Sequence, residues 1–226
     1  MSLLLNIDTA IDTACVSIAK NGHILQHTIN KDQKDHAAFL QPAIQSLFKT
    51  TGLSLYELDA IAVVEGPGSY TGLRVGMASA KGLCFALNKP LITVSSLAIL
   101  AYQAINQFSI VSNNIPLLYC PMIDARRMEV FTALYDHSLN TILPPCAMII
   151  DENFFANQLL KNRIIFLGNG ALKWQQICTH ENAYFFMPSN NSLYMNELSF
   201  KKFLNNEFAD TAYVEPLYVK EFYVNI

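Results

Sequence analysis

The chain has 226 residues, of which 52% are hydrophobic and 15% charged, and its formal net charge is −3. This length allows one large domain or two smaller lobes with an ample core, and the apolar composition excludes an intrinsically disordered chain. The low charged fraction indicates that a partner subunit covers part of the surface. The densest basic spots, Arg126-Arg127 and Lys201-Lys202, are too small for a nucleic-acid footprint, so we expect the chain alone to bind RNA weakly at best.

Nothing in the sequence indicates a membrane or secreted protein. No apolar run approaches the ~18 residues that a membrane helix needs, and the start, MSLLLNIDTA, reaches Asp8 without the basic region of a signal peptide. The five cysteines are odd in number and lack a CxxC spacing, which favours isolated buried thiols in a reducing cytosol. We therefore expect a cytoplasmic protein.

The first hundred residues predict three antiparallel strands followed by alternating helices and strands. Asn21-Gly22 is typical of a tight hairpin turn, Gly52 is expected to end a helix, and Pro42 to kink it. Such an order describes a mixed sheet covered by helices on both faces. The expected strands span 3–7, 15–19, 23–29, 60–64 and 91–95, and the expected helices span 36–50, about 70–87 and a stretch ending near 107, with a short helix near 54–58.

The second half of the chain begins like the first. LLLNIDTAIDTACVSIA (3–19) and LLYCPMIDARRMEVFTAL (117–134) both place an Ile-Asp pair at the end of an apolar strand, before a turn and a second strand. This match predicts a duplicated fold with Asp8 and Asp124 in equivalent places. We expect lobes at 1–108 and 109–226, with a boundary near 109–116, and a helix at 151–160, a strand at 164–168 and a helix at 172–178 in the second lobe.

The stretch VEGPGSYTGLR (64–74), which we call the glycine loop, lies between an expected strand and an expected helix. Backbone N–H groups at such a helix start suit an anion. A Walker A loop, however, needs lysine after its second glycine, and a dinucleotide fingerprint needs glycine at 71, where threonine stands. Phosphate binding therefore remains the weaker of two interpretations.

The helix after the glycine loop, TGLRVGMASAKGLCFAL, is apolar nearly all round, so both of its sides need a cover. Gly72, Gly76, Ser79 and Ala80 recur at steps of three and four, and such small residues let another helix approach closely. We expect this side to meet a partner chain; the alternative is burial under helix 36–50 of the same chain. Gly76 and Gly82 each cost about 0.5–1 kcal/mol relative to alanine in a helix, a cost that a close helix contact offsets.

Other candidate chemistry is sparse. His23 and His27 lie on an expected strand, about 13 Å apart, and cannot share one metal ion. His36 follows Asp35 at the start of an expected helix, where it is a helix cap, an interface residue or a metal ligand. Asp8 and Asp124 either hold magnesium and water in a phosphotransferase cleft or initiate turns. No serine lies in the G-x-S-x-G motif of hydrolases, and no other nucleophile or general base stands out. No catalytic residue and no metal site is therefore assigned.

Five segments in order along the chain resemble the bacterial TsaB (YeaZ) family: IDTAIDTACVSIA, DHAAFLQPAIQSLF, AIAVVEGPGSYTGLRVGMASAKGL, IDARRMEVFTALY and EPLYVK. The resemblance implies an α/β chain of the actin-like ATPase (ASKHA) fold, with two RNase H-like lobes whose mixed sheets are flanked by helices. It also implies a non-catalytic dimerisation and scaffold subunit of the complex that adds a threonylcarbamoyl group to the adenosine adjacent to the anticodon, in tRNAs reading codons that begin with A.

The resemblance further implies several partners. The catalytic subunit is TsaD. A P-loop ATPase, called TsaE, joins the complex. The chain forms a homodimer when alone, and it contacts tRNA only through the complex. No cofactor is intrinsic to the chain, although ATP or ADP is expected at the subunit interface. TsaD-type proteins carry an H-x-x-x-H metal pair on a helix, whereas here Leu40 stands four residues after His36. Without that pair the chain is not expected to transfer the group by itself.

These considerations assign two groups of site residues. The partner interface comprises His36, Phe39, Leu40, Thr71, Gly72, Leu73, Arg74, Gly76, Met77 and Ala80, and a degenerate nucleotide cleft comprises Asp8, Thr9, Asp124, Gly168 and Gly170. The rival hypotheses are a stand-alone ATPase or small-molecule kinase of the actin-like fold, and a metalloprotease.

Overall fold

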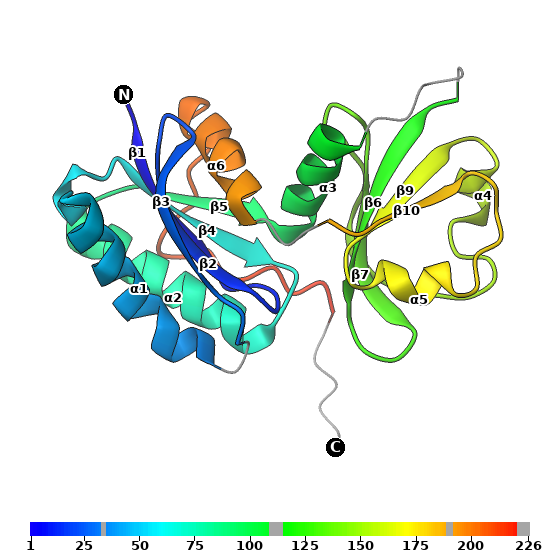
Figure 1. Cartoon of the computed structure of the whole chain (residues 1–226), viewed down its shortest axis with the longest axis horizontal. Helices are drawn as coiled ribbons and strands as arrows, with labels where there is room; N and C mark the ends of the chain where they lie inside the picture. The colour runs from blue at the N-terminus through cyan, green and yellow to red at the C-terminus, as the bar shows by residue number, and fades with distance from the viewer. Residues whose placement is uncertain (33–34, 109–114, 189–191, 221–226) are drawn as a thin grey trace. The chain divides into compact units, whose positions relative to one another are not determined.

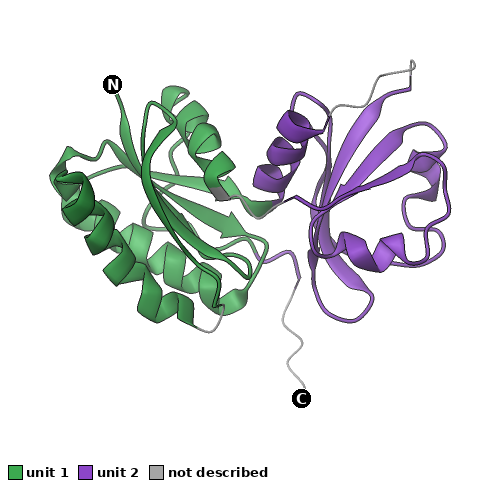
Figure 2. Cartoon of the chain, viewed as in Figure 1, with its two compact units in different colours: residues 1–96, 190–217 green, residues 97–189, 218–226 purple. Residues whose placement is uncertain are grey.

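A five-stranded mixed sheet organises each of two units of the chain (Figure 1, Figure 2). The structure is a computed structural model that describes residues 1–32, 35–108, 115–188 and 192–220. Unit 1 comprises residues 1–96 and 190–217, and unit 2 comprises residues 97–189 and 218–226. No helix of the described residues is long and apolar enough to cross a membrane.

The sheet of unit 1 has the strand order β3-β2-β1-β4-β5. Its centre is the strand β1 (Leu3–Asp8), which pairs antiparallel with β2 and parallel with β4 and is buried along its whole length. A strand buried on both faces needs a nearly continuous apolar run, and LLLNI supplies one. The remaining strands are β2 (Ala14–Lys20), β3 (His23–Asn30), β4 (Ala60–Gly66) and β5 (Leu91–Ser95).

Two helices, α1 (His36–Thr51) and α2 (Tyr70–Leu87), cover one face of this sheet side by side (Figure 1). Alternate residues of β1, among them Leu5 and Ile7, pack against them in one apolar core. Helix α1 continues through Pro42 and ends at Gly52, whose φ of 70° gives the left-handed cap that glycine adopts most easily. The expected short helix is the 3-10 turn η2 (Leu55–Glu57).

Helix α6 (Met195–Leu204) covers the opposite face of the same sheet, after the turn η3 (Ser192–Tyr194). A buried polar cluster fixes it there. Asn6 Nδ2 and Ser17 Oγ both donate to Asn196 Oδ1 at 2.8 Å, and Ser199 Oγ donates to Asn6 Oδ1. Because buried polar groups are costly when unpaired, these mutual hydrogen bonds specify how the returning chain docks.

The sheet of unit 2 repeats the topology of unit 1. Its order is β10-β9-β6-β7-β8, with β6 antiparallel to β7 and parallel to β9 as β1 is to β2 and β4. Asp8 ends β1 and Asp124 ends β6, so the predicted duplication and the equivalence of these two residues are confirmed. The strands are β6 (Leu117–Asp124), β7 (Glu129–Tyr135), β8 (Thr141–Ile149), β9 (Arg163–Leu167) and β10 (Ala183–Phe186).

The longest helix of unit 2 is α3 (Ser96–Gln107), all of which except Ser96 lies in that unit. Its other helices are short. The expected helix at 151–160 reduces to α4 (Ala156–Leu159), and the one at 172–178 is α5 (Ala171–Gln175). Aromatic side chains fill the core, with Phe154 and Trp174 edge-on at 5.3 Å between ring centroids. The many large rings compensate for the little helix available to cover this sheet.

The two units differ from the predicted lobes in two places. The division falls at 96/97 instead of 108/109, and residues 190–217 return to unit 1. The physical reason for the return is the Asn196 cluster together with burial of Met195 and Leu198. Of the boundary expected near 109–116, residues 109–114 lie outside the described residues.

Candidate partner interface and glycine loop

The glycine loop packs directly on the loop that joins β1 to β2. A Cβ added to Gly68 would lie 2.1 Å from Ala10 O, and one added to Gly72 would lie 2.0 Å from Thr9 O. The two loops are also joined by hydrogen bonds: Ser69 N donates to Ala10 O at 2.6 Å, and Thr9 Oγ1 donates to Gly72 O at 2.7 Å. These glycines are therefore required for two backbones to touch.

This packing uses groups that a phosphate would need. The N–H of Ser69 has Ala10 O as its acceptor, and the N–H of Gly72 has the Ser69 side-chain oxygen, which caps α2. Donors at a helix start attract an anion only where they are not already paired with protein acceptors. The geometry therefore favours a packing role for the glycine loop over a phosphate cradle.

The small side of α2 faces the sheet of its own chain and is not available to a partner. Gly76 lies against Thr9, whose Oγ1 would be 2.4 Å from an added Cβ, and Met77 and Ala80 are buried in the core of unit 1. The assignment of these residues to a partner interface is corrected by this burial. The same correction applies to the other buried members of that group: Gly72, Leu73, His36 and Leu40.

Three residues of the predicted interface do reach the surface. Thr71 and Arg74 are exposed on α2, and Phe39 is half-buried on α1. The guanidinium of Arg74 lies over the ring of Tyr70, 4.0 Å from its centroid. His36 instead contacts its own chain. Its Nε2 lies 3.0 Å from Ile11 O, a contact that holds the β1–β2 loop against α1.

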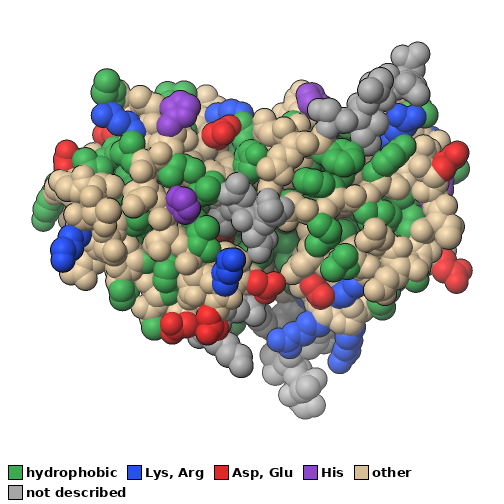
Figure 3. All heavy atoms as spheres, in the orientation of Figure 1, with side chains coloured by type: hydrophobic (Ala, Val, Ile, Leu, Met, Phe, Trp, Pro, Cys, Tyr) green, Lys and Arg blue, Asp and Glu red, His purple; other side chains and the backbone are tan. Residues whose placement is uncertain are grey.

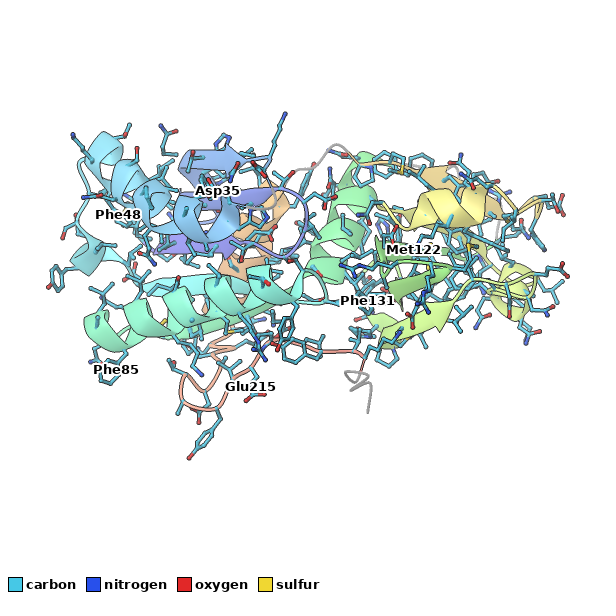
Figure 4. The ribbon with its side chains drawn as sticks, turned by 90° about the horizontal axis from the view of Figure 1, so that it is seen from below. Asp35, Phe48, Phe85, Met122, Phe131 and Glu215 are labelled. Carbon is cyan, nitrogen blue, oxygen red and sulfur yellow. The ribbon has the colours of Figure 1, made fainter. Side chains whose placement is uncertain are left out.

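The outward face of α1 and α2 carries a surface that the sequence reasoning missed. Gln41 Nε2 donates to Ser79 Oγ at 3.1 Å and links the two helices. Phe85 is 89% exposed and stands out from α2 in Figure 4. A large exposed apolar side chain beside uncharged neighbours offers a place where another chain could pack. We define the docking face as the exposed, uncharged residues Ala38, Gln41, Pro42, Gln45, Ala78, Gly82, Phe85 and Ala86.

Gly82 provides the signal that could have located this face. It lies in the fourth turn of α2, and apart from the adjoining backbone of that helix no described atom lies within 4 Å of the Cβ it lacks. Unlike Gly72 and Gly76, it has no reason within its own chain to be glycine. A helix-interior glycine without an intrachain contact leaves room for the close approach of another chain.

We predict that Gly82→Ala stabilises the isolated chain and weakens partner binding. The substitution should raise the free energy of unfolding by about 0.5–1 kcal/mol, because alanine has the higher helix propensity. The added methyl group should weaken the complex about tenfold by holding the facing helix away. Urea denaturation and titration with the partner measure the two effects, and a destabilised chain with unchanged affinity would contradict both.

The residues assigned to a nucleotide cleft are engaged within their own units. In unit 1, Asp8 is buried and its Oδ1 accepts from Ala10 N at 3.0 Å. In unit 2, Lys173 Nζ lies 2.6 Å from Asp124 Oδ1. Burial raises the pKa of Asp124, but hydrogen bonds from Lys173 and from the N–H of Arg126 outweigh it, so that the pKa lies below its usual value. Asp124 is therefore an ionised carboxylate that already has a cation.

Gly168 and Gly170 are also packed against protein. Gly170 N donates to Met122 O at 3.0 Å, and a Cβ on Gly168 would lie 2.5 Å from the same oxygen. The absence of side chains at these two glycines thus lets the β9–α5 turn pack against β6. This turn is the topological counterpart of the glycine loop in unit 1, because each follows the fourth strand of its unit.

The titratable groups offer little for covalent or metal chemistry. Burial raises the pKa of the thiols of Cys15, Cys84 and Cys120 to about 12, so these remain protonated near neutral pH and are poor nucleophiles. All five cysteines are free. Within the described ranges, no three His, Cys, Asp or Glu side chains form a group that could hold a metal ion.

Comparisons with known proteins place this fold and sequence in a family. The family model for TsaD, tRNA N6-adenosine threonylcarbamoyltransferase, matches residues 23–203. The tRNA threonylcarbamoyladenosine biosynthesis protein TsaB of Bacillus subtilis is 30% identical over 180 residues, which cover 77% of this chain and 74% of the relative. The chain belongs to the TsaB family.

Two further likenesses extend over nearly the whole chain. The TsaB of Haemophilus influenzae is 28% identical over 226 residues, covering 96% of this chain and 93% of the relative. The solved structure of YeaZ from Pseudomonas aeruginosa superposes with a TM-score of 0.76 at 24% identity, over 96% of this chain and all of that one. The predicted α/β class with two mixed sheets flanked by helices is thereby confirmed.

Proposed function

We propose that the chain is a non-catalytic scaffold subunit of the complex that adds a threonylcarbamoyl group to the adenosine adjacent to the anticodon, in tRNAs reading codons that begin with A. The observation that carries the proposal is the uncharged docking face, with its open Gly82, on a chain of the TsaB family. The relatives are described as tRNA threonylcarbamoyladenosine biosynthesis proteins, and a scaffold needs an apolar surface more than a reactive group.

The proposed occupant of the docking face is a TsaD-type catalytic subunit. The TsaD family model matches residues 23–203, a range that contains both α1 and α2. A partner of the same fold therefore presents an equivalent pair of helices, and two such pairs can meet about a pseudo-two-fold axis. The same geometry accounts for a homodimer of the chain when it is alone. A TsaE-type ATPase completes the proposed assembly, in which tRNA is met through the complex.

Three features support a non-catalytic role. His36 contacts Ile11 O and has Leu40 where a TsaD-type metal pair has its second histidine. The thiols of Cys15, Cys84 and Cys120 stay protonated near neutral pH. The glycine loop and the β1–β2 loop fill one another's space, which opposes the rival hypothesis of a stand-alone ATPase. We therefore propose that ATP or ADP binds at the shared interface and that no cofactor is intrinsic to this chain.

The experiment is a reconstituted modification assay with unmodified tRNA, the threonylcarbamoyl-adenylate donor, and the TsaD-type and TsaE-type proteins. Modification should require this chain, and this chain alone should neither modify tRNA nor hydrolyse ATP. Undiminished modification when the chain is omitted would contradict the scaffold role. Tight binding of ATP and magnesium with turnover by the isolated chain, measured by calorimetry, would favour the ATPase instead.

A further inference from the structure

The turn between β6 and β7 presents two adjacent arginines in an unusual backbone conformation. Arg126 and Arg127 have φ values of 70° and 46°, and both side chains are exposed. Glycine and asparagine adopt this left-handed region at lower cost than arginine. The turn itself therefore does not call for arginine, and a contact outside the turn would give these two side chains a role.

The turn is held rigidly by its neighbours. Asp124 Oδ1 accepts from the N–H of Arg126 at 2.6 Å and from Lys173 Nζ at 2.6 Å. Asn169 Oδ1 accepts from the N–H of Asp124 at 2.9 Å, and Lys173 Nζ also donates to Glu129 O at 3.1 Å. A braced turn fixes where its side chains begin, so less freedom is lost when they bind a ligand.

Two carboxylates of the turn region are each paired with a lysine, Asp124 with Lys173 and Glu129 with Lys220. Neither guanidinium has an ion-pair or hydrogen-bond partner in the part of the chain that the structure describes. The two guanidinium groups thus remain open to an anion from outside the chain, beside the carboxylates of Asp151 and Glu152 that follow β8.

We propose that Arg126 and Arg127 form an arginine tip that binds backbone phosphates of the tRNA while the chain is held in its complex. This inference rests on the proposed function. Guanidinium groups bind phosphate through paired N–H donors, and two of them on a fixed turn suit neighbouring phosphates of one strand. On the surface drawn in Figure 3, charged side chains of both signs are dispersed among apolar and polar ones. Two contacts are too few for binding by the chain alone, but they add to those of a catalytic partner.

The test uses the double variant Arg126→Asn, Arg127→Gly in the complex with the TsaD-type subunit. Asparagine and glycine suit the left-handed turn, so the melting temperature of the variant chain should rise or stay unchanged. Its affinity for an unmodified tRNA transcript should fall about tenfold near 0.1 M salt, and the slope of log K against log salt should decrease in magnitude by about one to two. The double variant Arg126→Lys, Arg127→Lys should retain most of the affinity, since the charges remain.

The matched control is the double variant Lys201→Gln, Lys202→Gln. It also removes two positive charges, but from α6 in unit 1, and should leave tRNA affinity at the wild-type level. If the complex modifies tRNA, and the arginine double variant binds tRNA as well as the lysine control does, the arginine tip is overturned while the proposed function stands. Loss of the TsaD-type subunit instead of tRNA would also overturn it, because the tip would then contact protein. Failure of the wild-type complex to bind and modify tRNA would overturn the proposed function as well.

Discussion

Replacing Ala78 by glutamate is expected to abolish binding of the catalytic subunit while the chain stays folded. Ala78 is exposed near the middle of α2 and belongs to the uncharged docking face, next to the open Gly82. In the free chain the new carboxylate lies in water and changes stability by about 0.5 kcal/mol at most. In the complex it would be buried without a partner, which costs several kcal/mol and lowers affinity by a factor of about 100 or more.

The measurement is a titration of the variant with the TsaD-type subunit, together with a urea denaturation of the variant alone. Thr50→Glu is the matched control, since it adds the same charge at an exposed position of α1 outside the docking face. We expect the control to bind normally and to support tRNA modification, whereas Ala78→Glu should do neither. Wild-type affinity of Ala78→Glu would show that the partner binds another surface.

The fold of unit 1 could largely be predicted from the sequence because its signals are local. The hairpin turn at Asn21-Gly22, the apolar β1 and the glycine after α1 each specify their own segment. The return of α6 could not be predicted, because its position depends on a hydrogen bond between Asn6 and Asn196, far apart in the chain. Burial of a polar cluster leaves no periodic pattern in a sequence.

Unit 2 was less predictable for two reasons. Strand β8 contains Pro144-Pro145, which argues against a strand, and it lies at an edge of the sheet, where proline is tolerated. The helix expected at 151–160 is interrupted by Phe155, whose φ is 54°. A large residue in that conformation breaks the helical pattern, and its ring is buried with the ring of Phe154 in the core.

For the candidate site, the sequence predicted an interface on α2 but placed it on the side of the helix that is buried against its own sheet. Composition alone shows that α2 needs two covers, and small residues occur on both sides of it. Which side faces the sheet depends on where Leu73, Met77 and Cys84 point, and these larger residues share the inner side with Gly76. The outer side has Ala78, Gly82 and Ala86, whose exposure follows only from the placed helix.

This assignment leads to the second large effect. Gly72→Ala should destabilise unit 1 by about 3 kcal/mol or more, because its Cβ would lie 2.0 Å from the backbone oxygen of Thr9. A backbone atom cannot move aside as a flexible side chain can, and the two loops would have to separate. Separation would also break the hydrogen bond from Thr9 Oγ1 to Gly72 O and uncover the buried β1–β2 loop.

The control lies ten residues further along the same helix. Gly82→Ala makes the same chemical change where nothing is within 4 Å, and it should stabilise the chain instead. Urea denaturation of both variants therefore should give midpoints on opposite sides of the wild-type value. Equal midpoints would contradict the contact between the glycine loop and the β1–β2 loop. A charged residue at Gly76 should likewise unfold unit 1, so loss of partner binding in such a variant would report on the core and not on the docking face.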